Sequence, residues 1–257
     1  MGLFDWLKQP SFGRGWLPDE ADARDVRLRD VATALHMVSA PPPSVNLRHP
    51  AISPRDQDGV QACVGFAWAQ GLELAYADRG LLTGDLSAQW IWFLGRATRG
   101  TAGLDRGMQL RDAAKIITRL GCATEETCPF VPRKFNVSPT WTAYRNAYDR
   151  RGLRGYYRID EGDADGVRVA LAAGRPVVGG WMIDQAFVDF RGRSVLGPSN
   201  NSLALGGHAL CVLGYDRESF TIINSWGPNW GDDGYARVTP SFIQQGSDLW
   251  AIDVHAS

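Results

Sequence analysis

The chain has 257 residues, 44% of them hydrophobic, which is enough for a substantial buried core in one large domain or two packed lobes. Its formal net charge of −1 gives no electrostatic basis for binding nucleic acid or an anionic membrane, and no run approaches the ~18 apolar residues of a membrane span. The sequence starts without the basic residues and long apolar run of a signal peptide, and it contains only four cysteines. We therefore expect a cytoplasmic protein, with non-classical delivery as an effector left open.

Residues 1–42 differ in character from the rest and are expected to form an N-terminal extension. A turn-rich stretch over residues 9–18 is followed by an apolar run over residues 31–38, which predicts a helix that the prolines at 41–43 end. Large apolar residues gather near the start of the extension, and each is worth roughly 1.5–3 kcal/mol when buried. They are Phe4, Trp6, Leu7, Phe12, Trp16 and Leu17. We therefore predict that the extension packs on the body of the protein or on a protein partner.

The next part of the chain is predicted to be mainly helical. Residues 63–76 are almost wholly apolar, which predicts a helix buried on most sides that begins at Cys63 and stops near Gly80. Residues 87–98 and 108–120 are predicted as two further helices, with loops at 82–85 and 99–107. From residue 155 the pattern changes to a short helix at 167–173 and strands at 175–182, 209–215, 220–224 and 234–238. Helices followed by strands predict an α+β fold with two lobes.

Three segments, far apart in the sequence, carry the groups that acyl transfer through a thioester requires. They are the segments that contain Gln57 and Cys63, Gly207 and His208, and Asn224. A thiol attacks, an imidazole takes and returns the proton, and an amide orients the imidazole. Such groups become neighbours in the fold rather than in the sequence. The start of a helix favours thiolate, so Cys63 is expected to have a lowered pKa.

These segments resemble those of the papain-like cysteine peptidases. Gln57 stands six residues before Cys63, an apolar stretch ending in Gly-Tyr follows His208, and residues 224–235 read Asn-Ser-Trp-Gly-x-x-Trp-Gly-x-x-Gly-Tyr. The resemblance implies a peptidase domain over residues 43–257 after the 1–42 extension. It also implies a papain-like two-lobe fold, with a helical lobe at about 55–154, a β-barrel-like lobe at about 155–257 and the active-site cleft between them.

The resemblance also implies roles for individual residues. Cys63 is the expected nucleophile and His208 the general base and acid, while Asn224 orients the imidazole. Gln57 is the expected side-chain donor of the oxyanion hole, with the backbone N–H of Cys63 as the second donor. The activity implied is that of a thiol endopeptidase acting on polypeptides through an acyl-enzyme. No metal-ligand spacing and no phosphate-binding glycine loop is present, so we expect no cofactor.

Three more residues are expected to contact substrate or to shape its site. Trp226 is expected to shield the Asn–His hydrogen bond from water, Trp230 to lie on the primed side of the cleft, and Gly107 to let the substrate backbone lie against the helical lobe. The chain departs from the plant and animal signature at Val60 and Val64, which stand where that signature has Cys and Trp. Neither position performs the chemistry.

Several alternatives remain open at this level. The same site serves an isopeptidase, an amidase or a transacylase, and a catalytically silent binding module would keep the fold without turnover. The extension is expected to brace the two lobes from behind; the alternative is that it lies along the cleft and restricts access of substrate. Cys122 and Cys128 are close enough in sequence to pair, but nothing in the sequence requires it.

Overall fold

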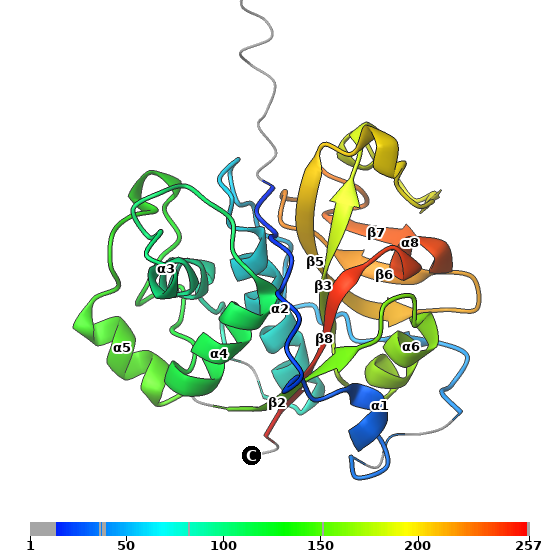
Figure 1. Ribbon diagram of the computed structural model, residues 1–257, viewed down its shortest axis with the longest axis horizontal. Coiled ribbons are helices and arrows are strands. Elements are labelled where there is room, and N and C mark those ends of the chain that lie inside the picture. Colours follow the sequence, from blue (N-terminus) through cyan, green and yellow to red (C-terminus); the bar gives the residue numbers. More distant parts are fainter. Residues whose placement is uncertain (1–13, 36, 38–39, 82, 151, 256–257) are drawn as a thin grey trace, which may run out of the picture.

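A computed structural model describes residues 14–255 except 36, 38, 39, 82 and 151. Figure 1 shows helices α2 to α5 gathered on one side and a twisted sheet with small helices on the other, with the first described residues (blue) descending between them. This is the α+β, two-lobe arrangement that the order of helices and strands predicts. Over the described residues, no helix is long and apolar enough to cross a membrane.

The helical lobe is built around α2 (Cys63–Asp78), which lies between the other helices and the sheet. It is accompanied by α3 (Ala88–Thr98), α4 (Leu110–Leu120) and α5 (Trp141–Tyr148), and by a short 3-10 turn (Pro132–Lys134). Two glycines let α2 approach its neighbours closely. A Cβ at Gly65 would lie 2.6 Å from the Ala88 carbonyl oxygen, and one at Gly71 would lie 2.5 Å from Ile252 Cδ1. The start of α2 is thereby fixed between the two lobes.

The β lobe is one sheet in the order β2-β8-β3-β5-β6-β7-β4, with β1 paired to β5 beside it. Its pairs are antiparallel except that β4 and β7 run parallel. The strands are β1 (Val45–Asn46), β2 (Leu153–Ile159), β3 (Val177–Ile183), β4 (Val195–Leu196), β5 (Gly206–Tyr215), β6 (Phe220–Ile223), β7 (Tyr235–Val238) and β8 (Ser247–Val254). The lobe expected to be barrel-like is therefore an open sheet among the described strands, since its two end strands, β2 and β4, do not pair.

Side chains alternate across the sheet and so divide the core in two. On β5, Ala209, Cys211 and Leu213 face α2 and join the core of the helical lobe. Leu210 and Val212 face the other way and join the second core, which α6 (Ala164–Ala172), α7 (Gln185–Val188) and α8 (Pro240–Gln244) cover together with α1 (Leu28–Val31). Strand β5 therefore carries His208 at the boundary between the two lobes.

Several element boundaries differ from those expected from the sequence. The helix predicted over residues 31–38 is wrong for residues 32–35, which form turns after α1 ends at Val31, and residues 36 and 38 lie outside the described residues. The helix predicted to begin at residue 108 begins at Leu110, because the backbone of Met108 pairs with the N-terminal segment instead. Phe4, Trp6, Leu7 and Phe12 lie outside the described residues; Trp16 and Leu17 lie within them.

Candidate active site

The Cys63 thiol sits at the first residue of α2 and is completely buried. Its Sγ accepts a hydrogen bond from the backbone N–H of Ala209 at 3.4 Å, across the boundary between the lobes. Ala209 directly follows His208 on β5, so the fold brings the thiol beside the imidazole-bearing residue despite their distance in sequence. The contact joins the N-terminus of a helix to a strand of the other lobe.

The His208 ring is held by Asn224 on its Nε2 side. Nε2 lies 2.7 Å from Asn224 Oδ1, and the backbone N–H of Ser225 donates to the same oxygen at 2.7 Å. That oxygen can only accept, so Nε2 carries the proton and Nδ1 is the basic nitrogen of the ring. The ring of Trp226 lies 4.5 Å from the His208 ring, centroid to centroid, and 6% of Trp226 is exposed. This cover keeps water from the amide–imidazole bond.

The Gln57 side chain links the loop before α2 to the segment that carries Asn224. Its Oε1 accepts from Ser225 Oγ at 2.6 Å, and its backbone N–H donates to the Ser225 carbonyl at 2.9 Å. Its Nε2 donates to the Val60 carbonyl at 2.5 Å. Because Oε1 is fixed by a hydroxyl donor, the amide can only present its NH₂ group on the other side, as an oxyanion-hole donor must.

Residues 14–17, here called the strap, lie across this site. The Gly15 N–H donates to Cys63 Sγ at 3.2 Å, and the Trp16 N–H donates to the Gly207 carbonyl at 3.3 Å. On the helical side, both backbone groups of Met108 form hydrogen bonds with the strap. Its N–H donates to the Gly15 carbonyl at 2.9 Å, and its carbonyl accepts from Leu17 at 3.1 Å. Cys63 and His208 consequently have no exposed surface.

The residues that follow the strap connect both lobes. The Asp19 carboxylate accepts from the backbone N–H of Arg111 on α4, while the Asp19 N–H donates to Asp248 on β8. Further along, Asp25 forms ion pairs with Arg111 at 2.6 Å and with Arg158 at 3.2 Å. Residues 14–25 of the extension therefore contact both lobes and cover the thiol.

Comparison with known proteins decides the family. Residues 41–246 match the family model described as papain family cysteine protease, which is most of the chain. The chain belongs to the papain family.

Its relatives within the papain family are distant. An uncharacterised peptidase C1-like protein of Acanthamoeba polyphaga mimivirus is 28% identical over 218 residues, 79% of this chain and 70% of that protein. A cathepsin B-like protein of Giardia intestinalis is 27% identical over 199 residues, 71% of this chain and 62% of that one. Among solved structures, xylellain, a cysteine protease from Xylella fastidiosa, superposes with a TM-score of 0.82 at 27% identity, covering 96% of this chain and 98% of its own. The chain is accordingly a cysteine peptidase of papain-like fold.

Burial favours the protonated form of the Cys63 thiol in this papain-family member. Burial raises the pKa of Cys63 to about 11, and the N–H donors of Ala209 and Gly15 offset only part of that rise. The sequence predicted a lowered pKa, because a helix N-terminus and an imidazolium favour thiolate. Burial of the sulfur outweighs the N–H donors, because removal from water disfavours a charged form.

Of the residues expected to contact substrate, Gly107 lies against the strap and Trp230 is buried in the β lobe. Gly107 faces the strap, where a Cβ would lie 2.2 Å from the Gly15 carbonyl oxygen. Trp230 is 1% exposed, packs on Phe187 with ring centroids 4.9 Å apart and donates to the Phe187 carbonyl. It lies behind the Trp226 ring as support. The sequence reasoning missed Ser225, which was visible within the Asn-Ser-Trp-Gly segment, and it gave a cleft-covering extension as one of two alternatives.

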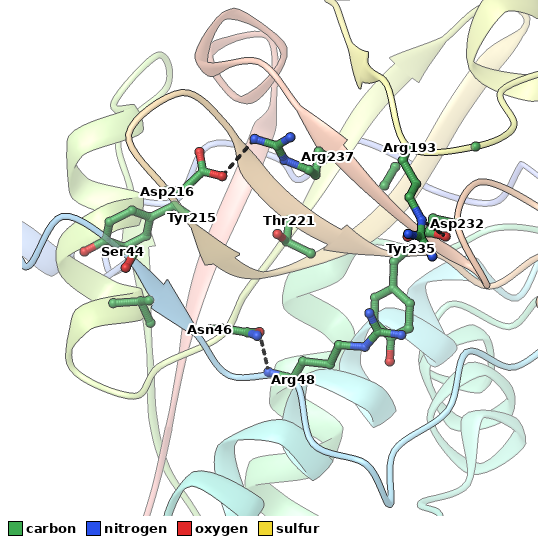
Figure 2. A pocket seen from close by; sticks show the side chains of 13 residues that line it. Ser44, Asn46, Arg48, Arg193, Tyr215, Asp216, Thr221, Asp232, Tyr235 and Arg237 are labelled. Atoms are coloured by element: carbon green, nitrogen blue, oxygen red, sulfur yellow. Dashed lines mark hydrogen bonds and ion pairs between the residues drawn. The ribbon is translucent and has the colours of Figure 1, made fainter.

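A cavity of about 490 Å³ lies elsewhere, on the outer side of the β lobe (Figure 2). The Arg48 guanidinium carbon lies over the Tyr235 ring, 3.8 Å from its centroid, and Arg237 forms an ion pair with Asp216 at 2.8 Å. None of the residues that line it belongs to the Cys63 site, and it holds no thiol or imidazole. It therefore has no part in the acyl-transfer chemistry.

Proposed function

We propose that Cys63, His208, Asn224 and Gln57 are the catalytic residues of this thiol endopeptidase, with polypeptides as its substrates. The observation that carries the proposal is the 2.7 Å contact between His208 and Asn224, formed beside a thiol at a helix N-terminus. An amide on Nε2 fixes the tautomer in which Nδ1 accepts a proton, and it adds no charge that would disfavour a thiolate–imidazolium pair.

In the proposed reaction, His208 takes the proton of the Cys63 thiol and the sulfur attacks the scissile carbonyl carbon. The carbonyl oxygen becomes an oxyanion that accepts hydrogen bonds from Gln57 Nε2 and from the backbone N–H of Cys63. When the carbonyl re-forms, the C–N bond breaks and the leaving amine takes its proton from His208. Water, deprotonated by the same imidazole, then hydrolyses the thioester and restores the thiol.

We also propose that the strapped form is a resting state of the enzyme. The group that the strap presents to Sγ is the Gly15 N–H, which the thiol cannot attack, whereas a substrate must present a carbonyl carbon there. The buried thiol is protonated in this state, because its pKa is raised to about 11. Turnover therefore requires the strap to leave, which readmits water to the sulfur and lets the helix N-terminus and the imidazole favour thiolate.

The domain boundaries and the cellular compartment are also part of the proposal. The family match begins at residue 41, which supports an extension over residues 1–42 and a peptidase domain over 43–257. All four cysteines are free, including Cys122 and Cys128, which supports maturation in a reducing compartment such as the cytoplasm.

The test uses the full chain, the Trp16→Ala variant that weakens the strap, and the same variant carrying Cys63→Ala. Each is incubated with internally quenched peptides, and the products are identified by mass spectrometry. We expect new α-amino and α-carboxyl ends from the Trp16→Ala protein and none when Cys63 is also removed. Hydrolysis that survives loss of the thiol would overturn the assignment of the nucleophile. Products cut only at isopeptide bonds or transferred to added amines would overturn endopeptidase activity in favour of the related reactions.

A further inference from the structure

A buried ion pair on the central helix has no part in the proposed acyl transfer. Glu73 lies on α2, ten residues after Cys63, and 3% of it is exposed. Its Oε1 accepts hydrogen bonds from Arg55 Nη2 at 2.8 Å and from the backbone N–H of Leu86 at 2.6 Å. Removing two charges from water is costly, and apolar residues of similar volume are often at least as stable in such a place. Stability therefore gives a poor account of why an ion pair stands here.

Arg55 joins α2 to two other segments. Its Nη1 donates to the Leu86 carbonyl at 2.7 Å, so the guanidinium binds both Glu73 and the turn before α3. Because a guanidinium presents its donors in a rigid planar fork, these two partners fix its orientation. The Arg55 backbone carbonyl accepts from the N–H of Gly227 at 3.1 Å, in the segment that follows Asn224. The side chain of Arg55 is thus anchored in the helical lobe, and its backbone is bound to the β lobe.

Arg55 begins a short backbone pairing that carries Gln57. Residues 55–57 run antiparallel to residues 225–227, with hydrogen bonds at both ends and a backbone bridge in the middle. At the far end the Gln57 N–H donates to the Ser225 carbonyl at 2.9 Å, and Ser225 Oγ donates to Gln57 Oε1 at 2.6 Å. The register of an antiparallel pair decides which residues lie opposite each other. The position of Arg55 therefore sets the position of Gln57, two residues further along.

We infer that the Arg55–Glu73 ion pair positions Gln57 as the oxyanion donor. The inference rests on the proposed endopeptidase function, in which Gln57 Nε2 donates to the oxyanion. Arg55 and Glu73 act through the 55–57 segment and not on the reacting atoms, so they are positioning residues. A donor stabilises the oxyanion only within hydrogen-bond distance of the developing charge, and a displacement of about 1 Å can lower the rate roughly 10²-fold.

The charge of Glu73 makes this positioning depend on pH. Charged and titratable groups from several segments interact with its carboxyl: Arg55, Asp85, Cys122, Glu125 and Cys211. Burial raises the pKa of Glu73 to about 7, and the Arg55 guanidinium offsets part of the rise. Since this pKa lies above the ordinary 4.5, the ion pair is complete above about pH 7 and is lost as the carboxyl takes up a proton below it.

The first experiment measures kcat and KM for a quenched peptide in the Trp16→Ala background, with and without Glu73→Gln. The substitution keeps the size of the side chain and removes its charge. We expect kcat to fall roughly 10–100-fold above about pH 7 with little change in KM, because the oxyanion hole acts on the transition state. The ratio of kcat between parent and variant should approach one as pH falls through about 7, where Glu73 is itself neutral. A ratio that does not change with pH would overturn the inference.

The second experiment repeats Glu73→Gln in a protein that already carries Trp16→Ala and Gln57→Ala. Residues that act as a unit have non-additive effects. We expect no further loss of kcat, because the donor that Glu73 positions has been removed. An equal loss with and without Gln57 would overturn the inference and leave the endopeptidase function intact. Absence of any cleavage by the Trp16→Ala parent would overturn the proposed function and, with it, this inference.

Two controls separate positioning from loss of stability. Asp253→Asn breaks another buried ion pair, the one that Asp253 of β8 forms with Arg175 at 3.1 Å, and it should lower the thermal unfolding temperature without lowering kcat. Arg55→Lys keeps the charge without the planar fork, so it should retain more kcat than Arg55→Met when both proteins are folded. Equal losses of kcat in Arg55→Lys and Arg55→Met, or a loss in Asp253→Asn as large as in Glu73→Gln, would overturn the inference.

Discussion

Replacing Trp16 by Ala should convert the resting protein into an active peptidase. The variant removes the indole from a site where only 7% of the residue is exposed, but it keeps the backbone hydrogen bonds of Gly15 and Leu17 to Met108. Truncation of a buried Phe or Trp costs about 3–5 kcal/mol in protein cores. We take the lower end, because the indole N–H is buried without a described acceptor, which already reduces what the ring contributes.

A loss of about 3 kcal/mol in strap closure changes the closing equilibrium about 100-fold, since each 1.4 kcal/mol is a factor of ten. Peptide hydrolysis and modification of Cys63 both require the open form, so both rates should rise together by up to that factor. The assay is the initial rate of hydrolysis of a quenched peptide, with iodoacetamide modification of Cys63 followed by mass spectrometry on the same sample.

The matched control is Trp141→Ala, the same substitution at a residue of α5 that is 76% exposed. It should change neither rate. A thermal unfolding curve for Trp16→Ala separates strap release from general loss of structure. Hydrolysis and labelling rates equal to those of the unaltered chain, in a folded Trp16→Ala protein, would refute the reasoning that the strap closes the site.

Three further outcomes are expected. In the Trp16→Ala background, Gln57→Ala should lower kcat by about 10²–10³, as loss of one oxyanion donor does. Equal kcat values for Gln57→Ala and its parent would contradict the role of Gln57. Asn224→Ala should lower kcat by a smaller factor, because Trp226 still confines the His208 ring. Burial, with the nearby carboxylate of Asp248, raises the pKa of Asp19 to about 6 from an ordinary 3.8. Its contribution to the free energy of unfolding should therefore be complete below pH 3.8 and lost as pH rises through about 6, and Asp19→Asn should remove that pH dependence in urea titrations. Thiol counting after denaturation without reductant should find four thiols, and two would reveal a disulfide.

The sequence was sufficient for the family, and it named the residues that the structure gathers at the candidate site. The segments around Cys63, His208 and Asn224 are short and locally distinctive, and the residues between them only have to fold so that the three meet. The helix that starts at Cys63 was predictable because nearly every residue of its first turns is apolar, and the order of helices before strands gave the two lobes. Gln57 was found by its spacing, but its bond to Ser225 required the structure.

Only the tertiary structure shows that the N-terminal segment covers Cys63 and that the thiol is buried. Nothing local to Gly15 or Trp16 says that they contact Cys63, Met108 and Gly207, because docking depends on surfaces supplied by distant segments. Met108 pairs with this segment, and α4 begins at Leu110. Burial raises the pKa of the thiol that the sequence expected to be low. A sequence pattern specifies which groups are present and the local backbone that carries them. Which side chains are buried away from water depends on the packing of the whole chain. Here that burial raises the pKa of the Cys63 thiol.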